Sequence, residues 1–227
     1  MIKMTQKQIR TIIIVITFFA ILISGIISKQ NFFRILPLFV SLFVVFFQAD
    51  ANRCAYLVGA FNAILYGIVY FSLGLYASAA SAVFFSTPIQ ILIFVRWQKR
   101  AYGQSTVMRK MSAKMRLIYL AVFAVAWVAV FIALTMAGSQ YEILDNTASL
   151  LSVLVLLLTM LAYVEYPFVW VIQIIISIIL NVQVTLVEPG HVTYLIYSIY
   201  NLYCAVSAFV NVRKLYKKQQ ENAQING

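Results

Sequence analysis

The sequence has 227 residues, of which 63% are hydrophobic and 10% are charged, and its mean hydropathy is +0.93. This composition leaves too little polar surface to cover a water-soluble core, so it excludes a soluble globular domain and predicts a polytopic membrane protein. The formal net charge of +11 does not indicate a nucleic-acid partner, because the basic residues stand at the ends of apolar runs, where they orient the chain and attract anionic lipid head groups.

The apolar runs predict eight transmembrane helices, since about 20 mainly apolar residues span the hydrocarbon core. The N-terminal run resembles a signal sequence, but no small-residue cleavage site precedes Lys29, so we expect an uncleaved first span. The second span gives the weakest signal, because it is short and has Pro37 in its first turn. The eight spans cover residues 11–28, 33–49, 54–72, 75–95, 117–137, 146–163, 166–187 and 192–212.

Residues 96–116 are the most basic segment of the chain, with seven of its 17 Lys and Arg residues and no acidic residue. Short loops rich in Lys and Arg stay on the cytoplasmic side of a membrane. Placing this segment inside leaves only two basic residues, Lys29 and Arg34, on the outer side. We therefore expect both termini to be cytoplasmic.

The order of the spans divides the chain into two similar halves. After a first helix in residues 1–30, we expect a three-helix repeat at 31–97, the basic loop with a linker helix at 98–140, a second three-helix repeat at 141–214 and a polar cytoplasmic tail at 215–227. The second and sixth spans both run inward, so the two repeats are parallel. Transporters use this arrangement to hold a substrate near the middle of the membrane.

Motifs for catalysis or metal binding are missing from the sequence. There is no G-x-x-x-x-G-K-[ST] phosphate loop, no Cys and His cluster with metal spacing, and no obvious partner for His191. We therefore expect neither an enzyme nor a cofactor. Since no Asp, Glu, Lys, Arg or His lies securely within the central part of any span, the sequence also favours uniport over a proton-driven carrier.

Short motifs resemble the PnuC family of bacterial vitamin transporters, over residues 33–214. The first repeat of that family has the pattern G-x-x-N-x-x-L-x-G followed by an L-Y-A-S turn. This chain has Gly59, Asn62, Leu65 and Gly67, followed by the turn at residues 75–78. The second repeat agrees in register at Asp145, Ser152, residues 163–165, Trp170 and Asn201.

The resemblance implies an all-α, SWEET-like membrane fold of three plus one plus three helices, to which this chain adds one N-terminal transmembrane helix. It implies facilitated diffusion of a nucleoside-like vitamin, usually nicotinamide riboside, across the bacterial inner membrane. It further implies that a cytoplasmic kinase traps the substrate by phosphorylation, and it suggests a homotrimer.

The chain departs from the family pattern in two places. The family has W-x-x-W-x-x-x-N in the penultimate helix, where this chain has Pro167 for the first Trp and Ile174 for the Asn. The fourth span lacks the usual Asn and has Thr-Pro-Ile-Gln at residues 87–90 nearby. Thiamine, riboflavin and deoxynucleosides therefore stay open as substrates. A substrate-capture subunit of a multi-component importer is a second alternative, since it would also be small, basic and apolar.

A site for a flat heterocycle with a sugar needs aromatic faces for stacking and amides or hydroxyls for hydrogen bonds. Tyr194, Tyr197 and Asn201 lie on one face of the last helix, at i, i+3 and i+7. Intramembrane Asn and Gln also serve packing alone, and Tyr and Trp also form interfacial belts. The candidate substrate-binding residues are Asn62, Gln90, Trp170, Gln173, Tyr197 and Asn201.

Three further residues of the spans have structural interpretations. Asp145 lies at the outer edge of its span, where we expect a solvated helix N-cap and not a ligand contact. Pro88 and Pro167 are expected either to act as hinges or to kink their helices with no role in gating.

Overall fold

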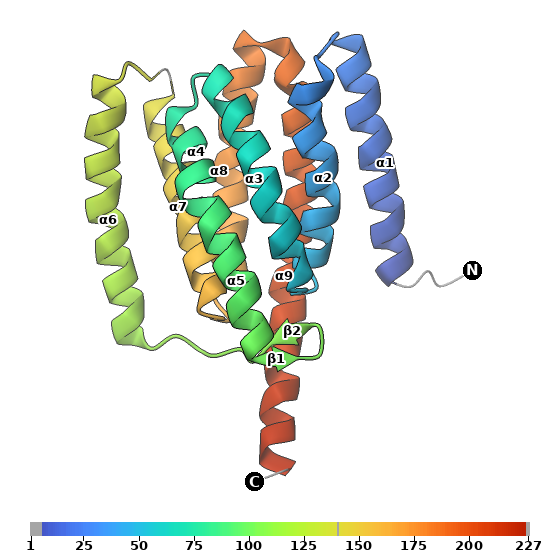
Figure 1. Cartoon of the computed structure of the whole chain (residues 1–227), viewed down its shortest axis with the longest axis vertical. Helices are drawn as coiled ribbons and strands as arrows, with labels where there is room; N and C mark the ends of the chain where they lie inside the picture. Colours follow the sequence, from blue (N-terminus) through green and yellow to red (C-terminus); the bar gives the residue numbers. More distant parts are fainter. Residues whose placement is uncertain (1–5, 140, 226–227) are drawn as a thin grey trace.

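The computed structural model describes residues 6–139 and 141–225, and nearly all of them are helical (Figure 1). Between α5 and α6, strands β1 and β2 form a two-stranded antiparallel hairpin that pairs Ala101 with Thr106. The elements are α1 (Gln6–Ile27), α2 (Phe32–Gln48), α3 (Cys54–Ser72), α4 (Tyr76–Ala80), the π-helix η1 (Ser81–Ser86), α5 (Thr87–Lys99), β1 (Ala101–Tyr102), β2 (Ser105–Thr106), α6 (Ala113–Met136), α7 (Glu142–Met160), α8 (Tyr166–Val187), the 3₁₀ turn η2 (Pro189–His191) and α9 (Val192–Ile225).

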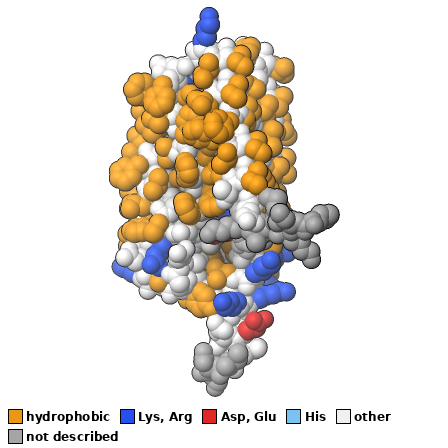
Figure 2. All heavy atoms as spheres, turned by 90° about the vertical axis from the view of Figure 1, so that its right-hand side faces the viewer, with side chains coloured by type: hydrophobic (Ala, Val, Ile, Leu, Met, Phe, Trp, Pro, Cys, Tyr) orange, Lys and Arg blue, Asp and Glu red, His pale blue; other side chains and the backbone are white. Residues whose placement is uncertain are grey.

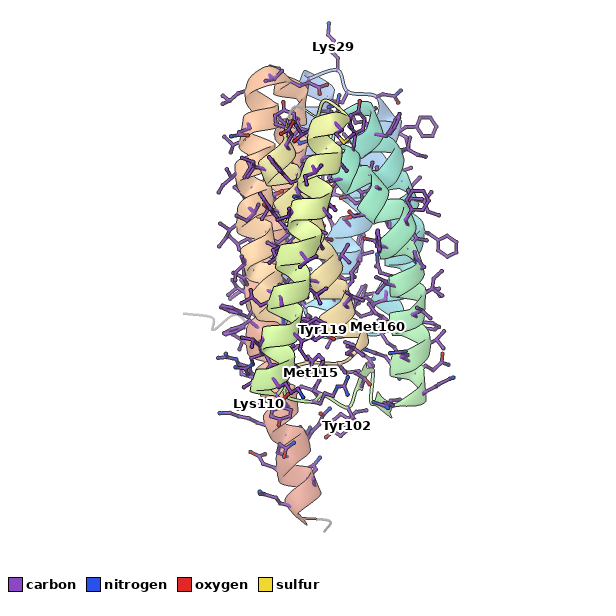
Figure 3. All side chains as sticks on the ribbon, turned by 90° about the vertical axis from the view of Figure 1, so that its left-hand side faces the viewer. Lys29, Tyr102, Lys110, Met115, Tyr119 and Met160 are labelled. Carbon is purple, nitrogen blue, oxygen red and sulfur yellow. The ribbon has the colours of Figure 1, made fainter. Side chains whose placement is uncertain are left out.

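The described helices have the lengths and surfaces of a membrane bundle. Seven helical segments are long and apolar enough to cross a membrane, and α2, with 17 residues, is a shorter apolar helix of the same bundle. Hydrophobic side chains cover most of the face around α1, and Lys and Arg gather toward one end (Figure 2). Lys29 projects from the opposite end to Tyr102 and Lys110 (Figure 3). Helix α1 begins, and α9 ends, at the basic end (Figure 1).

Helix α9 continues well beyond the end of the predicted span at residue 212. It has 34 residues and ends at Ile225, so residues 215–225 of the predicted polar tail are a helical extension of the bundle, and the last two lie outside the described residues. The extension docks on the β1–β2 region, where the Gln219 side chain accepts from the Met108 N–H and donates to the Thr106 carbonyl, both at 2.9 Å. Hydropathy could not reveal this extension, because polar contacts outside the lipid hold it.

The fourth predicted span is one continuous helical segment with a π-helix in its middle. The Thr87 N–H donates to the Ala82 carbonyl, five residues back, and the next residue is Pro88. Proline has no N–H and cannot continue the i to i−4 ladder, so the wider turn of η1 adjusts the helix before α5 begins.

Two groups of three transmembrane segments surround the interior of the bundle. We call α2, α3 and the α4–η1–α5 segment the first bundle, and α7, α8 and α9 the second bundle. The third segment of each bundle packs against the first helix of the other, which places α5 on α7 and α9 on α2. Helices α1 and α6 lie outside this ring, where α1 packs on α9 and α2, and α6 packs on α7. A relation between the bundles as SWEET-like repeats stays a prediction.

Asp145 joins the two bundles at the end that carries Lys29, which we call the outer end. The sequence predicts a solvated cap here, and this prediction is wrong, because Asp145 is fully buried. Its carboxylate accepts from the Ala77 N–H at 3.0 Å, from the Ser78 N–H at 3.1 Å and from the Ser78 hydroxyl. Asp145 on α7 therefore caps α4 of the other bundle, where helix N–H groups and the helix dipole favour a negative charge.

Candidate substrate-binding site

A cavity of about 240 Å³ lies between the two bundles. All six segments of the ring contribute to its wall, so no single helix forms it. The polar and aromatic residues of the wall are Ser41, Gln48, Tyr56, Asn62, Tyr66, Tyr70, Ser78, Ser81, Ser86, Gln90, Ser149, Ser152, Thr159, Tyr166, Trp170, Gln173, Ser177, Asn181, Tyr194, Tyr197, Ser198 and Asn201.

The structure brings all six sequence-predicted site residues to the wall of this cavity. Asn62 comes from α3 and Gln90 from α5, while the other four come from α8 and α9. Both bundles therefore contribute predicted site residues to the wall of one cavity. Substrate contact by these six residues stays a prediction.

Asn62 presents a fixed hydrogen-bond acceptor. Its Nδ2 donates to the Pro37 carbonyl at 3.0 Å and to Ser41 Oγ at 2.7 Å. A carbonyl only accepts, so the amide cannot turn its oxygen toward Pro37. The side chain is buried, and Oδ1 has no hydrogen-bond partner among the described residues. Asn62 thus uses its nitrogen to pack α3 on α2 and keeps its oxygen for another donor.

Gln90 offers a second unpartnered amide oxygen, and Gly59 makes room for it. Gln90 Oε1 is buried without a protein partner. A Cβ atom at Gly59 would lie 2.0 Å from this oxygen, so only glycine leaves space for the side chain in this position. The glycine of the family-like motif on α3 therefore shapes the site through a close contact with α5.

Asn201 supplies the third such oxygen, because its Oδ1 is also buried without a partner. Nearby on α8, Gln173 Nε2 donates to Ser177 Oγ at 2.9 Å. Buried polar groups in proteins nearly always have a hydrogen-bond partner. Three buried amide oxygens around one cavity are therefore the groups that a polar ligand with its own N–H or O–H donors would satisfy.

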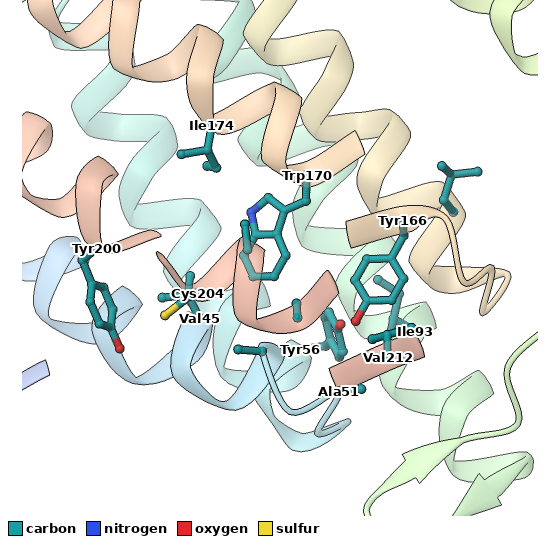
Figure 4. Close-up of a cluster of buried hydrophobic side chains, with 14 of the residues drawn as sticks. Val45, Ala51, Tyr56, Ile93, Tyr166, Trp170, Ile174, Tyr200, Cys204 and Val212 are labelled. Carbon is teal, nitrogen blue, oxygen red and sulfur yellow. The ribbon is translucent and has the colours of Figure 1, made fainter. Parts of the chain in front are cut away.

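Aromatic rings supply the flat walls of the cavity. Trp170 and Tyr166 project from α8 toward Tyr56 of α3 (Figure 4). Further along α3, Tyr66 and Tyr70 stack with ring centroids 5.3 Å apart and planes at 25°. Rings in these positions can stack on a planar heterocycle.

The sequence analysis missed several residues that line the cavity, and only for some of them does the sequence spacing indicate a shared helix face. Tyr66 and Tyr70 stand four and eight residues after Asn62, which is the spacing of one helix face. Asn181 and Ser198 also line the cavity but lie near the outer ends of α8 and α9, where the sequence suggests no role for them. Of the two positions of the penultimate helix that depart from the family pattern, Ile174 lines the cavity, whereas Pro167 is buried at the start of α8 and does not.

The cavity wall is uncharged. Within the described ranges, no Lys, Arg, His, Asp or Glu is among the residues that line it. Asp145 lies close by, next to Ser78, but its carboxylate is occupied by the N-terminus of α4. The described residues also hold no group of three or more His, Cys, Asp and Glu side chains that could bind a metal ion.

The sequence model of the nicotinamide mononucleotide transporter family matches residues 31–213. The crystal structure of the vitamin B3 transporter PnuC has a similar fold, with a TM-score of 0.80 at 18% sequence identity, over 95% of this chain and 94% of that chain. Because this match covers nearly the whole chain, it includes most of α1, which the family match leaves out. No curated protein matches the chain.

The family match spans well over half of the chain and includes every residue that lines the cavity. The fold match agrees with it and adds the peripheral first helix. The chain therefore belongs to the nicotinamide mononucleotide transporter family and is a membrane transporter, not an enzyme.

Proposed function

We propose that the protein is a uniporter that imports a nucleoside-like vitamin by facilitated diffusion, with nicotinamide riboside as the first candidate substrate. The observation that carries this proposal is the uncharged cavity of about 240 Å³ between the two bundles, walled by aromatic rings and buried amide oxygens. Rings of this kind hold a flat heterocycle, and acceptors of this kind receive the hydroxyl and amide donors of a nucleoside.

The wall chemistry supports a nucleoside over a nucleotide. Protein sites for phosphate use Arg, Lys or converging N–H groups, which form the strong charge-assisted hydrogen bonds that a phosphate requires. The described lining residues include no cationic side chain. Although the family name refers to nicotinamide mononucleotide, we therefore expect the unphosphorylated riboside to bind more tightly.

The wall also supports uniport. A carrier that couples transport to protons generally needs Asp, Glu, Lys, Arg or His along its path, and the described lining residues include none of these five types. Accumulation would then depend on chemistry after entry into the cell, such as phosphorylation by a cytoplasmic kinase. With the basic end on the cytoplasmic side of the bacterial inner membrane, the orientation would follow the usual distribution of Lys and Arg.

Other substrates and another class of protein are alternative outcomes. Ile174 replaces the Asn of the family pattern at the wall, which keeps thiamine and deoxynucleosides open. Riboflavin stays open as well, because a cavity volume of about 240 Å³ does not by itself separate one of these vitamins from another. A substrate-capture subunit would bind its vitamin tightly but would not transport it alone.

Uptake into liposomes that contain only the purified full-length protein tests the proposal. We expect uptake of radiolabelled nicotinamide riboside that equilibrates without ATP or a proton gradient, and little uptake of the mononucleotide. Tight binding without uptake would identify a capture subunit, and uptake of another vitamin in its place would overturn the substrate assignment. Protein-free liposomes are the control, and the mass of the detergent-solubilised particle tests the homotrimer.

A further inference from the structure

A chain of hydrogen bonds connects buried His191 to the cavity wall near the outer end. His191 Nε2 lies 2.8 Å from Asn181 Oδ1. Asn181 Nδ2 donates to Ser198 Oγ at 2.6 Å, and the Ser198 hydroxyl donates to the Tyr194 carbonyl at 2.9 Å. Asn181 and Ser198 line the cavity, whereas His191 does not. These hydrogen bonds therefore connect His191, which lies behind the wall, to Asn181 and Ser198, which lie on it.

The backbone carbonyl at the end of this chain fixes the position of every proton in it. A carbonyl only accepts, so the Ser198 hydroxyl gives its proton to Tyr194 and must accept from Asn181. The Asn181 nitrogen consequently faces Ser198, and its oxygen faces His191. His191 Nε2 must then carry a proton, which defines the tautomer. With the opposite amide orientation, the Ser198 and Tyr194 oxygens would face each other with no proton between them.

His191 is held firmly enough to support this orientation from the other side of the Asn181 amide. The side chain is fully buried, and its ring stacks on Tyr194 with centroids 4.6 Å apart and planes at 5°. Its other nitrogen, Nδ1, has no partner in the protein. The Nε2 hydrogen bond to Asn181 is therefore the directional contact of the imidazole among the described residues.

We infer that Asn181 contacts the substrate as a hydrogen-bond donor. His191 is the positioning residue that holds the Asn181 amide in the orientation in which it can donate. With Oδ1 turned toward His191 and one N–H given to Ser198, the remaining donor of the Asn181 amide is its second N–H. Asn62 offers a fixed acceptor elsewhere on the same wall. The cavity thus selects a solute that presents an acceptor, such as a carbonyl or ether oxygen, to Asn181 and a donor to Asn62. This inference rests on the proposed transport function.

Two substitutions of His191 separate the roles of its donor and its ring. His191→Gln keeps an N–H donor at the place of Nε2, while His191→Phe keeps the ring on Tyr194 but removes the donor, so that the orientation of the Asn181 amide then depends on Ser198 alone. In liposomes with nicotinamide riboside as the probe, we expect His191→Phe to raise KM about tenfold, the effect of losing one buried hydrogen bond. We expect kcat to change less than about twofold, and His191→Gln to stay within about threefold of the wild-type KM.

Asn181→Asp provides a second variant that does not depend on the folding of His191→Phe. The carboxylate still accepts from His191 but has no N–H for the substrate, so KM should rise at least about tenfold. The double variant with Asn181→Asp and His191→Phe should have a KM no higher than that of Asn181→Asp alone, because both changes remove the same contact with the substrate. Thr193→Val is the matched control: it removes a buried hydroxyl two residues after His191 that donates to Gln30 and to the Gly190 carbonyl and not to the wall, and KM should not change.

The outcomes distinguish this inference from the proposed function. If the wild-type protein transports neither nicotinamide riboside nor thiamine, riboflavin or a deoxynucleoside, the proposed function fails. If the wild-type protein transports nicotinamide riboside but KM stays within about twofold in both Asn181→Asp and His191→Phe, the inference fails alone. A KM that rises equally in His191→Phe and His191→Gln would also overturn it, because the donor would then not be the property that matters.

Discussion

At the scale of single residues, the cavity is defined by side chains that do two things at once. The nitrogen of Asn62 holds α3 on α2, while its oxygen is left for a ligand. The packing and the binding interpretations of this residue are therefore not exclusive. A buried acceptor without a partner costs about 1–3 kcal/mol, and a site that a ligand satisfies in each transport cycle recovers that cost on binding.

Trp170 and Asn201 are the residues whose removal we expect to affect transport most. Trp170→Ala removes a stacking wall, and Asn201→Ala removes one of the three unpartnered oxygens. Each variant should reduce initial uptake in liposomes to background, while expression and gel-filtration behaviour stay unchanged. Phe168→Ala, on the exposed face of the same helix as Trp170, should transport normally. Normal uptake by both Trp170→Ala and Asn201→Ala would remove these residues from the site.

Gly59→Ala should alter the site through Gln90. The added methyl group would lie 2.0 Å from Gln90 Oε1, so the flexible Gln90 side chain must move away while the backbone stays in place. We expect KM for the substrate to rise about tenfold, the cost of one lost hydrogen bond, with little change in thermal stability. In a Gln90→Ala background the same change should cost almost nothing further. An equal loss in both backgrounds would show that Gly59 acts by another route.

At the scale of helices, the α4–η1–α5 segment and α7 depend on each other. Asp145 of α7 caps the short α4, and Trp97 of α5 donates from Nε1 to the Thr159 carbonyl of α7 at 2.9 Å. The π-helix between these contacts places Ser81 and Ser86 on the cavity wall. The contact between the α4–η1–α5 segment and α7 is therefore held by hydrogen bonds at both ends, and the π-helix interrupts the regular α-helix between them. Whether Pro88 serves as a hinge in that middle stays a prediction.

Asp145→Ala should destabilise the protein more than Asp145→Asn does. The alanine leaves the Ala77 and Ser78 N–H groups and the Ser78 hydroxyl without their acceptor in a buried place. Each unsatisfied buried group costs about 1–3 kcal/mol, so we expect a clear drop in Tm in detergent, of which asparagine restores part through its remaining oxygen. Equal Tm values for the wild type and Asp145→Ala would show that the cap is dispensable.

The Arg34–Glu188 ion pair joins α2 to the turn before α9, and its contribution should depend on pH in a defined direction. The hydrogen bond from Arg34 holds the pKa of Glu188 below its ordinary value of 4.5. Stabilisation by the pair is therefore present above that ordinary value and is lost as the pH falls through the lowered pKa. The wild type should have a higher Tm than Glu188→Gln at pH 7, and the gap should close in strong acid. A gap that widens in acid would contradict the assignment.

At the scale of the whole molecule, contacts between the bundles close the ring at both ends of the cavity. The outer end has the Asp145 cap and the Arg34–Glu188 pair. The inner end has the Trp97 hydrogen bond and that of Asn211 Nδ2 to the Ala49 carbonyl at 3.0 Å. Movement of solute between two such bundles requires one set of contacts to open while the other holds. We expect the two sets to alternate during transport.

Labelling with a membrane-impermeant maleimide tests the orientation of the molecule. In a background with Cys54 and Cys204 replaced by alanine, Lys29→Cys should react in intact cells, and Lys218→Cys should react only after the membrane is opened. The reason is that Lys29 projects from the end opposite to the basic segments (Figure 3). Reaction of both positions in intact cells would refute the assignment of the basic end to the cytoplasm.

The membrane class, the helical spans and the family could be predicted from the sequence, because they depend on properties that add up along the chain. Hydropathy over about 20 residues locates a span, and short motifs such as the one around Gly59 identify relatives. The fold class and the family are confirmed, whereas the domain boundaries, the repeats and the roles of the site residues stay predictions. The sequence also selected six residues that the structure brings to one cavity, because polar side chains within apolar helices need a buried partner.

Only the tertiary structure decided which groups meet across helices. Asp145 was misjudged because its partners, Ala77 and Ser78, lie on another helix that no local pattern connects to it. The extension of α9 and the chain from His191 to the cavity were hidden for the same reason. A hydrogen bond has a direction and a partner, and both are set by how the helices pack, while hydrophobicity belongs to each residue alone. The sequence therefore determined which segments enter the membrane, and the packing of those segments determined what the cavity between them can bind.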